Sequence, residues 1–313
     1  MGQSTALLSF ELPSGDSISV VRQRFGTGEP RVALVAGIRG DAPEGIRVAF
    51  EVGQFLREHE DLLQGTVDIY PCVNPLAAEQ GMRHWPFFEV DQNRQFPGKE
   101  DGHPPSQVAY HLLQDLKNVD LVVELRGARP GFSEVPQAFV WEGDAQSLEY
   151  AKYTNVAVVW KRKSSVNAPK TFAYQFPHAI ILEGGRGNQL TEGIGESLKE
   201  GMLYLLSKLQ ILPEENLPFH WLTMEQPLLA EDVDVHRVRI NRGGLFLPKV
   251  SINAMVSEND EIGVVIQPST GEVLEKVCAP NTGKVIAMLN QPVVTPGSMV
   301  ARIFSEGDWD AYF

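Results

Sequence analysis

The stretch that decides the fold is residues 31–58, which read RVALVAGIRGDAPEGIRVAFEVGQFLRE. Its first six residues are an almost continuous apolar run that Gly37 closes, and such a run is typical of a strand buried on both faces of a sheet. Residues 43–58 carry apolar side chains at helical spacing, which predicts an amphipathic helix. A buried strand that leads directly into a helix is the building unit of α/β proteins.

The alternation of strand and helix continues along the first two thirds of the chain. Strands are predicted at residues 6–12, 17–24, 66–71, 119–125, 137–141, 156–160 and 179–183, and helices at residues 106–117 and 193–210. Residues 76–104 are irregular and contain several prolines, and loops of that length are usually functional or disordered. We therefore expect an α/β fold with a mixed sheet flanked by helices.

The composition changes near residue 212. A proline-rich stretch there predicts a linker at residues 213–225, between an α/β domain at 1–212 and a β domain at 226–313. The last domain has short strands and frequent turns, which favour a small barrel or sandwich. Part of it resembles a lipoyl/biotinyl-type hairpin barrel, but the tip at residues 269–272 has no lysine that could carry a cofactor.

Composition and charge exclude several classes of function. The chain of 313 residues has 27 Lys plus Arg against 40 Asp plus Glu, a net charge of −13 that argues against binding to nucleic acid or anionic membranes. The two cysteines, Cys72 and Cys278, are too few for a disulfide framework or a thiolate zinc site. No apolar run reaches the roughly 18 residues of a membrane span, and the first residues do not read as a signal peptide. We therefore expect a cytoplasmic protein.

Four polar segments follow the predicted strands, where α/β proteins place their ligands. They are GIRGDAPEG at residues 37–45, DQNRQFPG at 91–98, ELRG at 124–127 and IILEGG at 180–185. In this order and spacing they resemble the succinylglutamate desuccinylase/aspartoacylase family, and the second segment is the most specific. The resemblance covers nearly the whole chain. It implies a zinc carboxypeptidase-like sheet flanked by helices, followed by a small all-β, barrel-like domain.

The chain departs from this family at the positions that bind zinc. Family members have a Gly-x-His-Gly-Asp-Glu loop and an Asp-Leu-His segment, and the corresponding positions here hold Arg39, Ala42 and Arg126. Zinc needs imidazole, thiolate or carboxylate ligands, whereas arginine is cationic and has no lone pair to offer. Glu44 does not substitute, because two residues along a helix turn a side chain away by roughly 200°. We therefore expect no metal and no cofactor.

Other family residues are retained. The resemblance implies that Asn93 and Arg94 hold a substrate carboxylate, that Arg83 is a further substrate-side arginine, and that Glu183 is the general base. The two arginines at the zinc positions, Arg39 and Arg126, then replace the cation as anion binders, or they form ion pairs with Glu183.

These residues lead to one preferred function and several alternatives. The preferred interpretation is a metal-free pseudo-hydrolase that binds a small, carboxylate-bearing amino acid or acyl amino acid. In this interpretation the chain forms a homo-oligomer, or it is the partner of an active paralogue in a hetero-oligomer. One alternative is an N-acyl amino acid deacylase that works without zinc through Glu183 and the arginines. The others are a zinc deacylase with relocated ligands and a purely structural subunit. Whether the chain is an enzyme stays open at this point.

Overall fold

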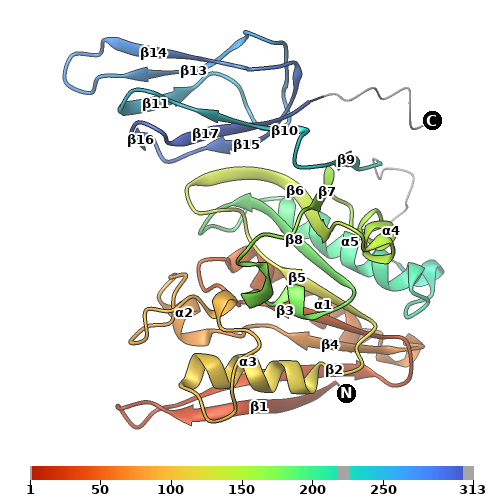
Figure 1. Cartoon of the computed structure of the whole chain (residues 1–313). Helices are drawn as coiled ribbons and strands as arrows, with labels where there is room; N and C mark the ends of the chain where they lie inside the picture. Colours follow the sequence, from red (N-terminus) through yellow and green to blue (C-terminus); the bar gives the residue numbers. More distant parts are fainter. Residues whose placement is uncertain (1, 218–225, 306–313) are drawn as a thin grey trace.

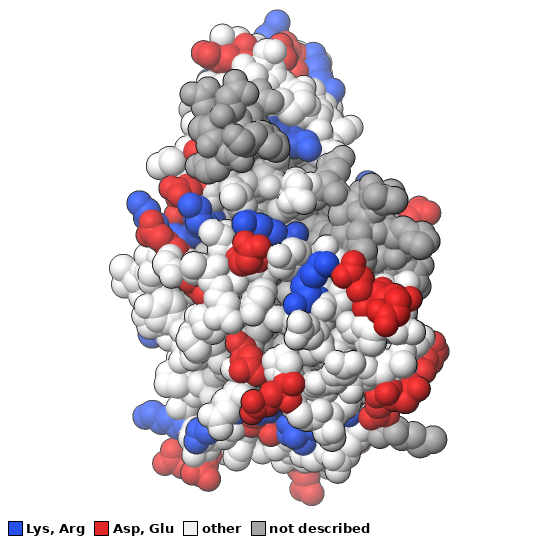
Figure 2. All heavy atoms as spheres, turned by 90° about the vertical axis from the view of Figure 1, so that its right-hand side faces the viewer, with Lys and Arg blue, Asp and Glu red and all other residues white. Residues whose placement is uncertain are grey.

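The computed structural model describes residues 2–217 and 226–305. Figure 1 shows an α/β part, which contains all the α-helices that the figure labels, and a β part stacked on it. Figure 2 shows acidic and basic side chains interspersed over one face, so on that face the net charge of −13 is spread rather than gathered in one patch.

Four parallel strands form the centre of the α/β part. They are β4 (Thr66–Tyr70), β3 (Arg31–Ala36), β5 (Leu121–Leu125) and β8 (Ala179–Arg186), in that spatial order. The hairpin of β1 (Gln3–Glu11) and β2 (Ser17–Gly26) pairs antiparallel with β4. The mixed sheet is therefore confirmed, and the strand predicted at residues 31–36 has the bounds that its apolar run indicated.

Helices cover both faces of this sheet. Helices α1 (Pro43–Glu58), α4 (Ala145–Ala151) and α5 (Ile194–Lys208) lie on one face, and α2 (Pro75–Glu79) and α3 (Pro104–Asp115) lie on the other. Alternate residues of β3 point into the hydrophobic cores on the two faces of the sheet. Leu34 packs with α1 and α5, whereas Val35 packs with α3. The short helices α2 and α4 were not predicted from the sequence.

The sheet continues into the β part. Strand β6 (Phe132–Trp141) pairs with β8 on one side and with β15 (Gly283–Leu289) on the other, and β15 leads on to β17 (Met299–Ser305) and β10 (Val235–Arg239). Three short or edge strands complete it: β7 (Val158–Arg162), β9 (Leu228–Ala230) and β12 (Met255–Val256). The two parts of the chain thus share one 13-stranded sheet.

A separate four-stranded sheet covers the other side of the β part. It consists of β14 (Val273–Cys278), β13 (Glu261–Ile266), β11 (Gly244–Pro248) and β16 (Val293–Val294). Its buried side chains, among them Phe246, pack against Val285 and Ile303 of the large sheet. The predicted all-β region is therefore confirmed. Residues 218–225 of the predicted linker and residues 306–313 lie outside the described residues.

Within residues 2–217 and 226–305, no helix combines the length and the apolar character that a membrane span requires.

Candidate functional site

The three positions at which the resemblance placed zinc ligands come together at one end of the sheet. Strands β3 and β5 are parallel neighbours, so Arg39 and Arg126, which follow them, leave the sheet at the same edge. Helix α1 begins beside them because Gly45 lies directly against β5. A Cβ atom at Gly45 would lie 2.4 Å from the carbonyl oxygen of Leu125, so only glycine allows this approach. Ala42 thereby lies next to Gly127.

The side chains at these three positions do not fit a zinc ion. Two are guanidinium groups and the third is a methyl group, so none of them has a lone pair for a divalent cation. Glu44 faces elsewhere, because its Oε2 accepts a hydrogen bond of 2.7 Å from the backbone N–H of Thr191. No group of three His, Cys, Asp or Glu side chains that could hold a metal occurs within residues 2–217 and 226–305.

Arg126 is paired within its own strand segment. Residues two apart in a strand point to the same face, and Nε of Arg126 lies 2.5 Å from Oε1 of Glu124. Burial alone would lower the pKa of Arg126, but the charges of Glu124 and Glu183 outweigh burial and raise it. An ion pair between Arg126 and Glu183, which was one of the two alternatives left open by the sequence, is therefore not formed, because the partner within reach is Glu124.

Arg83 is paired with Asp91 across the loop between α2 and α3. Both Nε and Nη2 of Arg83 donate to Oδ2 of Asp91, at 3.0 and 2.7 Å. Burial favours a raised pKa for Asp91, but Arg83 and Arg39 outweigh burial and hold its pKa below the usual value. The other carboxylate oxygen, Oδ1, accepts the backbone N–H of Asn93 at 2.9 Å and thereby caps the 3-10 turn Gln92–Arg94.

Arg39 is the arginine without a partner. Its guanidinium forms no hydrogen bond or ion pair with any residue of the described chain, and its Nε atom is buried. Burial, together with the positive charges of Arg126 and Arg83, lowers its pKa to about 10. Three guanidinium groups therefore act on one another here. Among the described residues, Glu124 and Asp91 form ion pairs with two of them, and the charge of Asp41 acts on Arg39 and Arg83 without a contact.

Asn93 and Arg94 are held beside this group by the same capped turn. Oδ1 of Asn93 accepts the backbone N–H of Phe172 at 2.8 Å, which fixes the amide, while its Nδ2 is buried without a partner. Nη1 of Arg94 donates to the carbonyl oxygen of Asn93 at 2.7 Å. No described carboxylate forms an ion pair with Arg94, and no described contact joins its side chain to Arg39 or Arg126.

Glu183 lies on β8, with only 8% of its surface exposed. It forms no hydrogen bond or ion pair with another described residue, and its partner across the strands is Gln137 of β6. Gln137 is fully buried, and neither of its side-chain amide atoms has a partner. A bulge between Glu134 and Gln137 interrupts the ladder with β8. Burial and the charge of Glu183 raise the pKa of Glu134 to about 7.

The sequence reasoning missed three residues of this site: Glu124, Glu134 and Gln137. Glu124 was detectable, because an acidic residue inside an otherwise apolar strand requires a partner, and Arg126 lies on the same face. Glu134 and Gln137 depend on the bulge in β6, for which the sequence offers no signal.

Comparisons with known proteins identify the family of this chain. Residues 28–209 match the family model described as the succinylglutamate desuccinylase/aspartoacylase catalytic domain. This region is more than half of the chain and contains the whole site, so the chain belongs to the succinylglutamate desuccinylase/aspartoacylase family, a family of deacylases.

The individual relatives match this chain either over a short segment or at low sequence identity. An Nα-acetyl-L-2,4-diaminobutyric acid deacetylase from Halomonas elongata is 30% identical over 122 residues, which are 39% of this chain and 34% of that protein. The chain therefore matches about a third of this curated relative. A succinylglutamate desuccinylase/aspartoacylase structure from Rhodobacter sphaeroides has a TM-score of 0.82 at 19% identity, and the match covers 98% of this chain and 96% of that one. The product-bound ectoine utilization protein of Ruegeria pomeroyi has a TM-score of 0.77 at 20% identity, with 95% and 93% covered. At these low identities, the TM-scores over nearly the whole of both chains show a shared fold alone.

Proposed function

We propose that this chain binds a small, carboxylate-bearing amino acid or acyl amino acid without zinc. Arg39, Arg83 and Arg126 form the binding site, and Asn93 and Arg94 contribute from the capped turn. The observation that carries the proposal is Arg39, a partly buried side chain whose guanidinium has no partner in the described chain and whose Nε is fully buried. Burial and two neighbouring arginines lower its pKa.

A carboxylate ligand would relieve each unfavourable feature of this group. Its oxygens would accept hydrogen bonds from Arg39 and from the free Nδ2 of Asn93, which are buried donors without partners. Its charge would offset the repulsion among the three guanidinium groups. Hydrogen bonds to a charged group contribute about 1.5–3 kcal/mol each, so one such contact is enough for selective binding.

The same site lacks a means to activate water by the zinc route. Bulk water has a pKa of about 15.7 and zinc lowers it to roughly 7, so the carboxylate of Glu183 alone has a much harder proton to remove. We therefore propose a pseudo-hydrolase that binds the ligand of the family without its zinc chemistry. Its role would be that of a partner to an active paralogue or of a ligand-binding homo-oligomer.

The experiment combines metal analysis with calorimetry on the purified full-length chain. We expect no stoichiometric zinc, and binding of Nα-acetyl-L-2,4-diaminobutyrate or N-succinyl-L-glutamate that Arg39→Gln weakens by about tenfold or more. Arg57→Gln, on an exposed part of α1, is the matched control and should bind as the parent does. One zinc ion per chain would refute the metal-free part. No affinity for any acyl amino acid would refute the binding part and favour a structural subunit.

A hydrolase without zinc is the second candidate, and Glu183 is the observation that favours it. Its carboxylate is buried, has no ion pair in the described chain and lies close enough to Arg126 to raise the pKa of that arginine. In this candidate Glu183 takes a proton from water, and the arginines stabilise the oxyanion. A turnover assay on the same two compounds decides it: Glu183→Gln should abolish hydrolysis. Equal rates for the parent and the variant, or no hydrolysis by the parent, would remove this candidate.

A further inference from the structure

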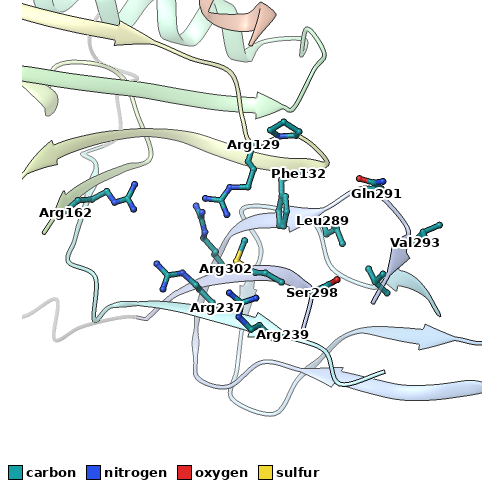
Figure 3. Close-up of a pocket in the computed structure, with 13 residues that line it drawn as sticks. Arg129, Phe132, Arg162, Arg237, Arg239, Leu289, Gln291, Val293, Ser298 and Arg302 are labelled. Carbon is teal, nitrogen blue, oxygen red and sulfur yellow. The ribbon is translucent and has the colours of Figure 1, made fainter. Parts of the chain in front are cut away.

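A second group of arginines lines a cavity where the α/β part meets the β part. The cavity has a volume of about 530 Å³. Five arginines from four separate segments line it: Arg129, Arg162, Arg237, Arg239 and Arg302. Figure 3 shows the guanidinium groups of Arg129, Arg162, Arg237 and Arg302 around one common space. None of the arginines of the site described above lines this cavity.

The strand pairing brings two of these arginines together at a cost in stability. Arg237 of β10 is the direct cross-strand partner of Arg302 of β17. Like charges in this position repel one another and destabilise a sheet. Such a pair is tolerated most readily where a negative charge lies between the two groups, so the pairing favours an anion at this place.

Arg302 is the buried member of the group. It is 3% exposed, and its Nε has no partner. Its one ion pair with a described residue is a long one, with Nη1 3.4 Å from Oε1 of Glu134. Burial and the charges of Arg129 and Arg162 hold the pKa of Arg302 below its usual value. An unpartnered, buried donor in a cavity wall is the feature that an anionic ligand would satisfy.

The remaining arginines have even fewer negative partners. Within residues 2–217 and 226–305, no carboxylate forms an ion pair with Arg129, Arg162, Arg237 or Arg239. Arg162 lies over the ring of Trp160, with Cζ 5.3 Å from the centroid, and Nη1 of Arg239 donates to the carbonyl oxygen of Gly297 at 2.7 Å. The cavity wall therefore carries an excess of positive charge in a chain whose net charge is −13.

We infer that this cavity binds a small organic polyanion, which is a phosphorylated compound or a polycarboxylate. The arginine forks would hold its anionic groups, since guanidinium matches phosphate and carboxylate geometry with paired hydrogen bonds. Phe132, Leu289 and Met299 in the same wall would contact the apolar part of the ligand. Pockets for small molecules have volumes of about 300–1,000 Å³, and this cavity lies within that range.

Calorimetric titration of the full-length chain with inorganic pyrophosphate and with citrate, at low salt, tests this inference. We expect one equivalent of at least one probe to bind, and the double variant Arg237→Gln/Arg239→Gln to weaken it by about tenfold or more. Both side chains are exposed on β10, so the variant should fold, and its melting temperature checks this. Pyrophosphate binding alone indicates a phosphorylated ligand, and citrate binding alone indicates a polycarboxylate.

Two controls separate this site from the first one. Arg242→Gln removes an exposed arginine that does not line the cavity, and Arg39→Gln removes the unpartnered arginine of the first site. Both should bind the probe as the parent does, whatever the outcome for acyl amino acids. If neither probe binds, if the double variant binds unchanged, or if Arg39→Gln alone abolishes binding, the inference is wrong. If the double variant melts early, Arg237→Gln alone replaces it, with the same expected direction.

Discussion

Two groups of three arginines differ in how their charges are balanced: one lies on strands of the central sheet, and the other lies in the loops at the end of that sheet. Around Asp68 of β4, Arg24 and Arg31 each lie 2.7 Å from a carboxylate oxygen of Asp68, and Arg22 lies 2.7 Å from Asp115. Around Arg39, the two neighbouring arginines have acidic partners, but Arg39 has none in the described chain.

This difference distinguishes a cluster that joins strands from the binding site that we propose. Arginines that gather around carboxylates hold strands together, and the Asp68 group joins β2, β3 and β4 in this way. Clustered arginines alone therefore say little about function. A buried guanidinium without a partner is a different matter, because its unmade hydrogen bonds destabilise the free protein and are available to a ligand.

The largest effect is expected when the balanced cluster is broken. Asp68 is fully buried, and Asp68→Asn leaves Arg24 and Arg31 facing a neutral amide. Removing one partner of a buried ion pair typically costs about 3–5 kcal/mol, so the free energy of unfolding should fall by an amount in that range. Urea denaturation followed by circular dichroism measures it.

The control for this prediction is an ion pair on the surface. Glu149→Gln removes the partner of Lys152 on α4, and exposed pairs contribute about 0–1 kcal/mol. If Asp68→Asn and Glu149→Gln cost the same, the Asp68 group does not stabilise the sheet and the contrast with Arg39 disappears.

The pH dependence of stability should differ in sign between two buried carboxyl groups, Asp68 and Glu134. Burial would raise the pKa of Asp68, but Arg24 and Arg31 lower it, so its contribution is present above the unfolded value of 3.8 and is lost as the pH falls. The contribution of Glu134 to stability changes with pH in the opposite direction. Because burial and Glu183 raise its pKa from 4.5 to about 7, the folded state binds the extra proton, and stability falls as the pH rises across that window.

Glu134→Gln should therefore flatten the loss of stability between pH 4.5 and about 7. Each unit of pKa change corresponds to about 1.4 kcal/mol, so the loss of stability that the variant removes across this window should be about 3 kcal/mol. Urea denaturation at several pH values measures the slope, which is independent of any constant offset from the lost contact with Arg302. Parallel curves for the parent and the variant would contradict the raised pKa of Glu134.

Much of the fold could be predicted from local pattern. The apolar run at residues 31–36 and the helical spacing at 43–58 were sufficient for β3 and α1, whose bounds agree with the prediction. Strand β6 was predicted only at residues 137–141, although it begins at Phe132, because the polar residues around its bulge obscure the alternation. The helix α4 has 7 residues, too few for its period to be recognised.

The position of the candidate site could be predicted from the sequence, but the ion-pair partners of its residues could not. Parallel strands bring the residues after β3 and β5 to one edge, so the convergence of Arg39 and Arg126 follows from their places in the sequence. The sequence left open whether Arg126 pairs with Glu183. Its partner is Glu124, because which side chain reaches a guanidinium depends on rotamers and packing. The five-arginine cavity was not predicted, since its members come from four distant segments that only the shared sheet brings together.

The smallest effect on stability is expected at the unbalanced cluster. Arg39→Gln removes a partly buried charge that forms no described contact and that two neighbouring arginines repel. The free energy of unfolding should stay within about 0.5 kcal/mol of the parent or rise, whereas a paired arginine in this position would cost several kcal/mol. The parent should gain stability when an acyl amino acid is added, in proportion to ligand occupancy, and the variant should not. Thermal melting with and without the ligand measures both effects. A variant that loses as much stability as Asp68→Asn would show that Arg39 holds the fold together, and the distinction between the two clusters would then fail.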